Sequence, residues 1–134
     1  MPALDNLIFI ADPAIAPWTV REGDNCPIQF IVKYNGVAVD LTGVTGTCSI
    51  RATFDAAADL VVPTVTFPSP LSSGTVRVTL SAAQATTLAG SVPAGTDPLT
   101  RVAQVGVYDV ELQDGTNQVT ILSGSSLVSR EVTP

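Results

Sequence analysis

The sequence predicts an all-β protein, a single antiparallel β-sandwich. Ten glycines and ten prolines divide the 134 residues into short segments, and these segments are rich in Val, Thr and Ile, which favour strands. Short strands bounded by frequent turns are typical of a sandwich or a barrel. The length is that of one domain. Because only 5% of the residues are aromatic, small apolar side chains must build most of the core.

The first strand is predicted over residues 26 to 34, where apolar residues at positions 28, 30 and 32 give one face to the core. Asn35 and Gly36 follow directly, and both can take the positive φ of a type I′ hairpin turn. We therefore expect residues 26 to 34 to pair with residues 37 to 40.

Two more strands are predicted over residues 47 to 54 and 74 to 80 from the same alternation. Their inward-facing residues are Cys48, Ile50 and Ala52 in the first and Val76, Val78 and Leu80 in the second. Residues 56 to 73, between them, contain three prolines, which have no N–H to donate to a ladder. Any pairing there belongs to a sheet edge or to an irregular crossing, and we expect this segment to be a site of partner contact or of variation.

One short helix is predicted over about residues 82 to 88. Ser81 can cap its start, and Gln84 stands three residues later in the capping-box position. Gly90 follows where the helix should end.

A long hairpin is predicted at the end of the chain, with Asp114 and Gly115 as its turn. Its first strand alternates Tyr108, Val110 and Leu112 with Val107 and the polar residues at 109, 111 and 113. The elements together predict an Ig-like or jelly-roll sandwich over residues 20 to 134, preceded by an extended N-terminal arm, residues 1 to 19.

Charge and composition exclude several classes of function. Twelve acidic residues against six basic ones give a net charge of −6, which disfavours binding to the nucleic-acid backbone. No apolar run approaches the roughly 20 residues of a membrane-spanning helix. The first residues have no basic region typical of a signal peptide, so we expect synthesis and assembly in a cytoplasm.

Metal and cofactor sites are not expected either. The chain has no histidine and only two cysteines, so a zinc site is excluded. Cys26 and Cys48 can form a disulfide if their strands are neighbours, but in a reducing compartment we expect two thiols.

Asp40, in the segment Asp-Leu-Thr-Gly, raises the question of an acid protease. That chemistry needs two aspartates that share a proton, and the segment has no second copy. The alternative is a turn, in which Asp40 accepts backbone N–H bonds, Leu41 enters the core and Gly43 takes a positive φ. We favour the turn.

Two other groups of residues are candidate sites. Asp109 and Glu111 share a strand face that could hold calcium or act as an acid pair, but alternation with buried residues is typical of a solvent-facing sheet surface. A sugar-binding module would depend on Trp18, Tyr34 or Phe54. No set of residues forms a catalytic constellation, and we expect no enzyme activity.

An ordered series of short motifs resembles a module of tailed-phage virions. The series comprises Gly23-Asp24, the segment Gly36 to Gly43, Ile50-Arg51, Tyr108 to Leu112 and Val132-Thr133. It is similar to the N-terminal domain of phage baseplate upper proteins and to small tail or head accessory proteins, over roughly residues 20 to 133. The resemblance implies a non-enzymatic sandwich that docks on tail, baseplate or fibre-attachment proteins. Because no coiled-coil stem follows, capsid decoration on the major capsid protein is the alternative.

The N-terminal arm is too apolar for a free tail, so we expect it to add a strand to a neighbour or to fill its groove. Its anchors are predicted to be Leu7, Ile8, Phe9 and Ile10, with Trp18 at its base. We expect a homo-oligomer within the virion, with symmetry imposed by the particle.

Overall fold

The structure, a computed structural model, describes residues 14 to 130. It contains ten strands, one 3-10 helix and one α-helix. Their bounds are β1 Ala14–Ile15, β2 Trp18–Arg21, β3 Cys26–Ile31, β4 Lys33–Tyr34, β5 Val37–Ala38, β6 Thr45–Arg51, β7 Thr64–Thr66, η2 Leu71–Ser73, β8 Thr75–Leu80, α1 Ala82–Ala89, β9 Val102–Gln113 and β10 Gln118–Ser129.

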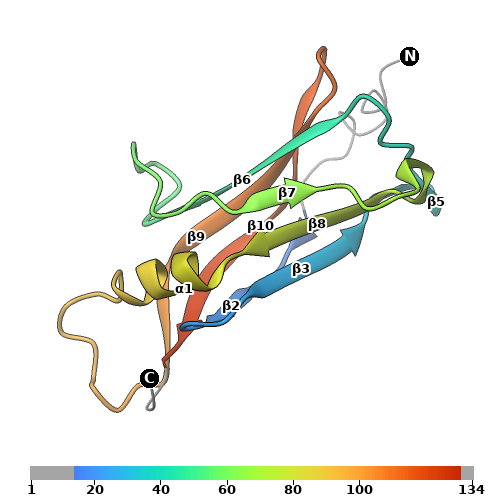
Figure 1. Ribbon diagram of the computed structural model, residues 1–134. Coiled ribbons are helices and arrows are strands. Elements are labelled where there is room, and N and C mark those ends of the chain that lie inside the picture. The colour runs from blue at the N-terminus through green and yellow to red at the C-terminus, as the bar shows by residue number, and fades with distance from the viewer. Residues whose placement is uncertain (1–13, 131–134) are drawn as a thin grey trace.

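Two sheets face each other, with α1 at one end and the short β4–β5 hairpin at the other (Figure 1). One sheet has the order β1-β10-β9-β6, with β2 also paired to β10, and the other has the order β3-β8-β7. The fold is therefore a β-sandwich with one helix, which confirms the predicted all-β sandwich class. The segment with three prolines contributes β7, an edge strand of the smaller sheet, as predicted.

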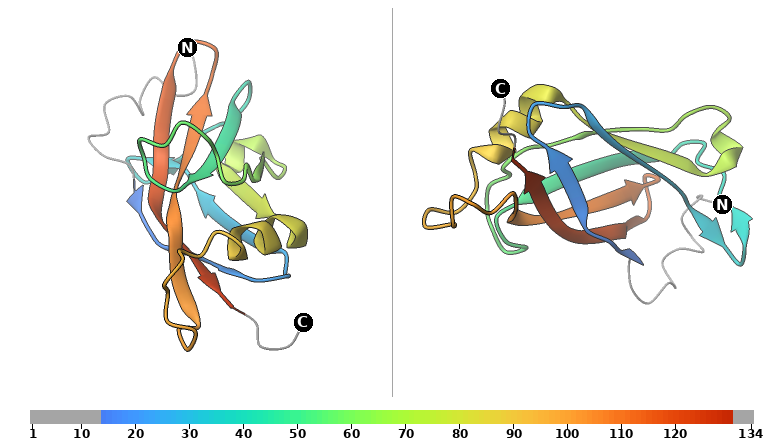
Figure 2. Two further views of the ribbon diagram at one scale, coloured as in Figure 1. Left: turned by 90° about the vertical axis from the view of Figure 1, so that its left-hand side faces the viewer. Right: turned by 90° about the horizontal axis from the view of Figure 1, so that it is seen from below.

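Not all of the strand pairing is antiparallel, and this corrects the prediction. Both β1 and β2 run parallel to β10, and Figure 2 shows β2 alongside it. These strands lie at opposite ends of the chain, so no turn motif links them and no local pattern signals their pairing. Within the predicted arm, Ala14–Ile15 and Trp18–Thr19 pair with β10 of the larger sheet.

The hairpin predicted from residues 26 to 34 is shorter than expected. Only β4 and β5 pair across the turn, where Asn35 and Gly36 have φ of 51° and 79°, as a type I′ turn requires. The preceding strand β3 pairs with β8 instead. The change of partner occurs at Val32, whose N–H donates to the Gly74 carbonyl at 2.8 Å.

The core is centred on Trp18 and Tyr108, whose rings meet edge to face at 5.4 Å. Around them lie the small apolar residues that the alternation predicted, including Val76, Val78 and Leu80, all fully buried. The predicted helix is confirmed as α1, with both hydrogen bonds of its capping box formed between Ser81 and Gln84.

Candidate functional site

The predicted turn residues around Asp40 stabilise a turn of the fold. The Asp40 carboxylate accepts hydrogen bonds from the Thr42 N–H at 3.0 Å and the Thr42 hydroxyl at 2.7 Å, and these bonds hold the pKa of Asp40 below its usual value. Leu41 is 1% exposed in the core, and Gly43 has a φ of +78°. The segment therefore folds as the predicted turn.

The turn between β9 and β10 is held in the same way. The Asp114 carboxylate accepts from the N–H groups of Thr116 at 2.9 Å and Asn117 at 2.7 Å. Gly115 has a φ of +90°, which glycine takes at little cost. The predicted pair Asp114 and Gly115 is confirmed.

The prediction that Trp18 is a partner-binding residue at the base of the arm is wrong. Its side chain is only 3% exposed, because pairing of β2 with β10 directs it into the sandwich. It cannot serve as a partner contact or a sugar platform in the folded chain. The other predicted anchors, Leu7, Ile8, Phe9 and Ile10, lie outside the described residues.

The two cysteines are separate thiols. Cys26 lies in β3 of the smaller sheet, and Cys48 lies in β6 of the larger one. Burial, helped by the charge of Asp109, raises the pKa of the Cys48 thiol to about 12, so this thiol is unreactive at neutral pH.

The outer face of β6 and β9 carries several polar side chains. Ser49 lies directly opposite Asp109, and Thr47 lies opposite Glu111. Burial and the nearby charge of Glu111 raise the pKa of the Asp109 carboxyl. Glu111 in turn accepts a hydrogen bond from the Gln118 side chain.

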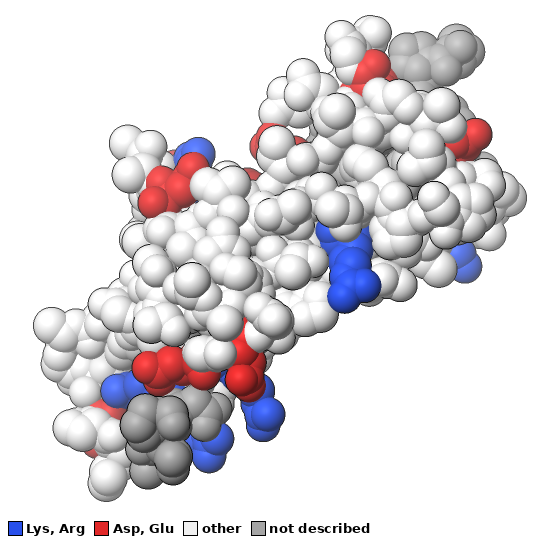
Figure 3. All heavy atoms as spheres, viewed as in Figure 1, with Lys and Arg blue, Asp and Glu red and all other residues white. Residues whose placement is uncertain are grey.

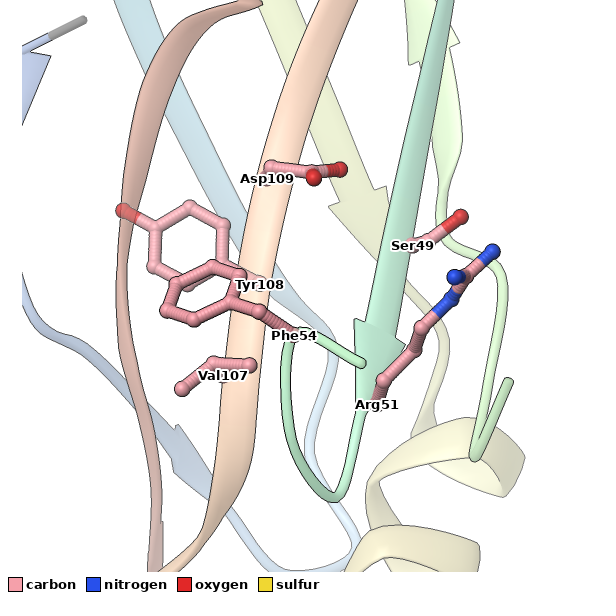
Figure 4. A pocket seen from close by; sticks show the side chains of 6 residues that line it. All are labelled: Ser49, Arg51, Phe54, Val107, Tyr108 and Asp109. Atoms are coloured by element: carbon pink, nitrogen blue, oxygen red, sulfur yellow. The ribbon is translucent and has the colours of Figure 1, made fainter. Parts of the chain in front are cut away.

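A shallow hollow, open to solvent and with room for about one water molecule, lies on this face (Figure 4). Its lining residues come from β6, β9 and the loop after β6; they are Ser49, Arg51, Phe54, Val107, Tyr108 and Asp109. Figure 4 shows Phe54 reaching across β9 beside Val107, while Asp109 and Ser49 lie farther along the two strands.

Arg51 ties the loop that carries Phe54 to the sheet. Its Nε donates to Asp59 at 2.7 Å, and its Nη1 donates to the Ala56 carbonyl at 3.2 Å. The sequence motif marked Arg51 only as the end of a strand, because nothing local signals a partner eight residues away across a loop. Ser49 was missed for the same reason, since its role depends on Asp109 in a distant strand.

Exposed apolar side chains gather at both ends of the sandwich. Ile31, Val37 and Leu71 lie at the end with the β4–β5 hairpin, and Leu99 and Val102 lie at the end with α1. The face drawn in Figure 3 is largely uncharged, with acidic and basic groups scattered over it.

Residues 14 to 130 contain no group of three metal-ligating side chains. Within the same range, no helix has the length and apolar character needed to cross a membrane.

Comparisons with known proteins add one structural likeness. No protein-family model matches the chain, and no curated protein matches it. Among solved structures the chain is similar to the crystal structure of the ZIG-8-RIG-5 IG1-IG1 heterodimer, with 10% identity, a TM-score of 0.42, and coverage of 92% of this chain and 88% of that one. A likeness at this level carries no argument about function, and the fold assignment rests on the strands described above.

Proposed function

We propose that the chain is a non-enzymatic structural subunit of a tailed-bacteriophage virion, docked on the tail, baseplate or fibre-attachment region. The observation that carries the proposal is the ordered series of motifs from Gly23-Asp24 to Val132-Thr133. Because these motifs form no catalytic set, the proposal is an argument by analogy with the proteins that they resemble.

The places of the motifs in the fold support this proposal. Gly23 has a φ of +81° in the turn between β2 and β3, and the segment from Gly36 to Gly43 contains two glycines with positive φ. Tyr108 fills the core, and its hydroxyl donates to the Ala16 carbonyl at 2.8 Å. The described motif residues thus specify turns and core, as expected if the resemblance lies in the scaffold.

The surface offers contacts suited to assembly. Apolar side chains at the two ends of the sandwich would be covered by neighbours in a particle, which favours association. In this proposal the subunit assembles in the host cytoplasm, forms a homo-oligomer set by the symmetry of the particle and remains in the virion. A place on the capsid as a decoration protein is the alternative location.

Immunogold labelling of purified particles of the encoding phage tests the proposal. Gold at the tail tip or fibre base is expected, and particles from a deletion strain are the control. Gold over the head would assign the subunit to capsid decoration. Particles that carry no label, although the antibody detects the purified subunit, would refute the virion role.

A truncation tests whether residues 1 to 13 attach the subunit. The cut should fall before Ala14, because the Ala16 N–H donates to Ser123 at 2.9 Å and its carbonyl accepts from Tyr108. The truncated protein is expected to fold but not to join particles. If it still decorates them, the arm does not provide attachment.

A further inference from the structure

The strand β3 is an edge strand whose outer backbone groups are unpaired. Among the described residues it pairs with β8 alone, at the end of the smaller sheet (Figure 1). The Val32 N–H donates to the Gly74 carbonyl, and hydrogen-bonded pairs alternate along an antiparallel ladder. The backbone groups of Pro27, Gln29 and Ile31 therefore face the open edge. Within residues 14 to 130 the N–H groups of Gln29 and Ile31 have no acceptor.

The flank of the core beside β3 is also open. The inward side chains of β3, which are those of Cys26, Ile28 and Phe30, pack against the core but are only half-buried. The inward side chains of the central strand β8 are fully buried. The difference arises because β8 has a strand on each side and β3 has a strand on one side only. A further strand beside β3 would cover apolar side chains and pair the free N–H groups.

The other sheet edges are less available. On the far side of the sandwich, β6 and β7 pack together so closely that a Cβ on Gly46 would lie 2.6 Å from a side chain of β7. The edge formed by β1 and β2 is interrupted at Pro17, which has no N–H. Farther along β2, the Arg21 N–H already donates to the Cys26 thiol at 3.3 Å. Of these edges, β3 is the one that offers two successive free donors.

A segment suited to fill this edge precedes β1. Residues 7 to 10 read Leu-Ile-Phe-Ile, and β-branched and aromatic residues favour strands. The segment contains no proline and no charge, so each of its N–H groups could join a ladder. As an added strand it would place alternate side chains over the half-buried flank of β3.

The chain's own β3 is a poor acceptor for this segment. Residues 7 to 10 precede β1, which belongs to the larger sheet, whereas the free edge of β3 belongs to the smaller sheet. The three residues between the segment and β1 span at most roughly 10 Å, and two packed sheets are about 10 Å apart. Crossing between the sheets would use that whole length and leave none for turning along β3. A second copy is free of this constraint.

From these observations we propose that residues 7 to 10 of one copy add a strand to the free edge of β3 in a second copy. The added strand bonds to the backbone of Gln29 and Ile31 and covers Ile28 and Phe30. Because the donor and acceptor surfaces differ, the contact is either exchanged reciprocally in a dimer or repeated from copy to copy in a ring. The inference rests on the attachment role proposed above for residues 1 to 13 and names the surface that receives them.

Size-exclusion chromatography with light scattering on the full chain tests the contact over a range of concentrations. The parent chain should form dimers or rings as its concentration rises. Gln29→Pro removes an N–H that the fold does not use, and proline is tolerated in an edge strand. Its apparent dissociation constant should be roughly tenfold higher or more. Gln29→Ala keeps the N–H and is the matched control, expected to associate like the parent chain.

A donor variant provides an independent check, because its changes lie outside the described strands. The double substitution Ile8→Asp with Phe9→Asp should abolish self-association, since carboxylates cannot replace apolar side chains over the core. Mixed in equal amounts with Gln29→Pro, this variant should form mixed complexes, because it keeps an intact β3 edge and Gln29→Pro keeps an intact donor segment. Thermal unfolding checks that each variant is folded.

Two results would overturn the proposal. One is a parent chain that stays monomeric at every concentration, or that associates equally well after Gln29→Pro and after the double substitution. The other is slow hydrogen exchange at Gln29 and Ile31 in a monomeric parent chain, which would assign the edge to the chain's own N-terminal segment. Neither result bears on the virion role, which gold labelling of particles decides separately.

Discussion

The two faces of β9 differ sharply in what they contact. On the inner face, Tyr108, Val110 and Leu112 are buried in the core. On the outer face, Val107, Asp109 and Glu111 are half-buried, and the first two line a shallow hollow open to solvent. The same strand therefore encodes the fold on one side and leaves the other side open to functional variation.

The difference extends to the ionisable groups. Cys48 on the inner side of β6 is held neutral by burial, which raises its pKa to about 12. Asp109 on the outer side is half-buried, and its raised pKa reflects both burial and repulsion from Glu111. Inner-face substitutions should thus change stability strongly, and outer-face substitutions should change it little.

The largest effect is expected from Tyr108→Ala. Loss of the ring removes its packing against Trp18 and its hydrogen bond to Ala16, which should lower the free energy of unfolding by about 3–5 kcal/mol. Val107→Ala, on the other face, should cost roughly 0.5 kcal/mol or less. Urea unfolding measures both values, and equal losses would contradict the division between the two faces.

The next largest effect is expected in the rate of thiol modification, which should differ between the buried side of β6 and the surface. Iodoacetamide should modify half-buried Cys26 in the folded protein, while Cys48 should react at least roughly a hundredfold more slowly, equivalent to about 2.8 kcal/mol of protection. Mass spectrometry of peptides quantifies each site. In denaturant the two rates should converge, and fast modification of Cys48 without denaturant would mean that the core opens readily.

Gly124→Ala tests the parallel pairing along β10. A Cβ at this position would lie 1.9 Å from the Ala16 carbonyl oxygen, so the N-terminal strand must move away, at a cost of about 1–3 kcal/mol. Ser123→Ala is the neighbouring control, with an expected change of roughly 0.5 kcal/mol or less. If Gly124→Ala unfolds at the same urea concentration as the parent chain, β1 does not dock here.

The smallest effect is expected from Asp109→Asn. Because the folded pKa of Asp109 is raised, its ionisation opposes folding above that pKa, and this penalty vanishes as pH falls toward the ordinary aspartate value of about 3.9. The variant should be more stable at pH 7 by a few tenths of a kcal/mol, on the order expected for a solvent-screened charge. Urea unfolding at pH 7 and pH 3.5 checks it, and the same gain at both values would contradict an electrostatic cause.

The site was only partly predictable. Phe54 and Asp109 could be noticed separately, one as an exposed aromatic residue and one as an acidic residue in an alternating strand. The position of Phe54 near β9 depends on the pairing of β6 with β9 and on the ion pair between Arg51 and Asp59, which holds the loop after β6. Neither contact has a signature in local sequence, because sheet pairing between distant segments is decided by the packing of the whole core.

The sequence by itself determined the all-β class, the two-residue turns, the capped helix and the inward-facing residues of β8 and β9. These features depend on local chemistry: backbone freedom of Gly and Asn, the capping box, and alternation with period two. Only the tertiary structure decided that β1 and β2 run parallel to β10, that β3 pairs with β8, and that Trp18 is core. Those outcomes depend on which distant strands bury their apolar faces together, and that choice minimises the free energy of the whole chain rather than of any one segment.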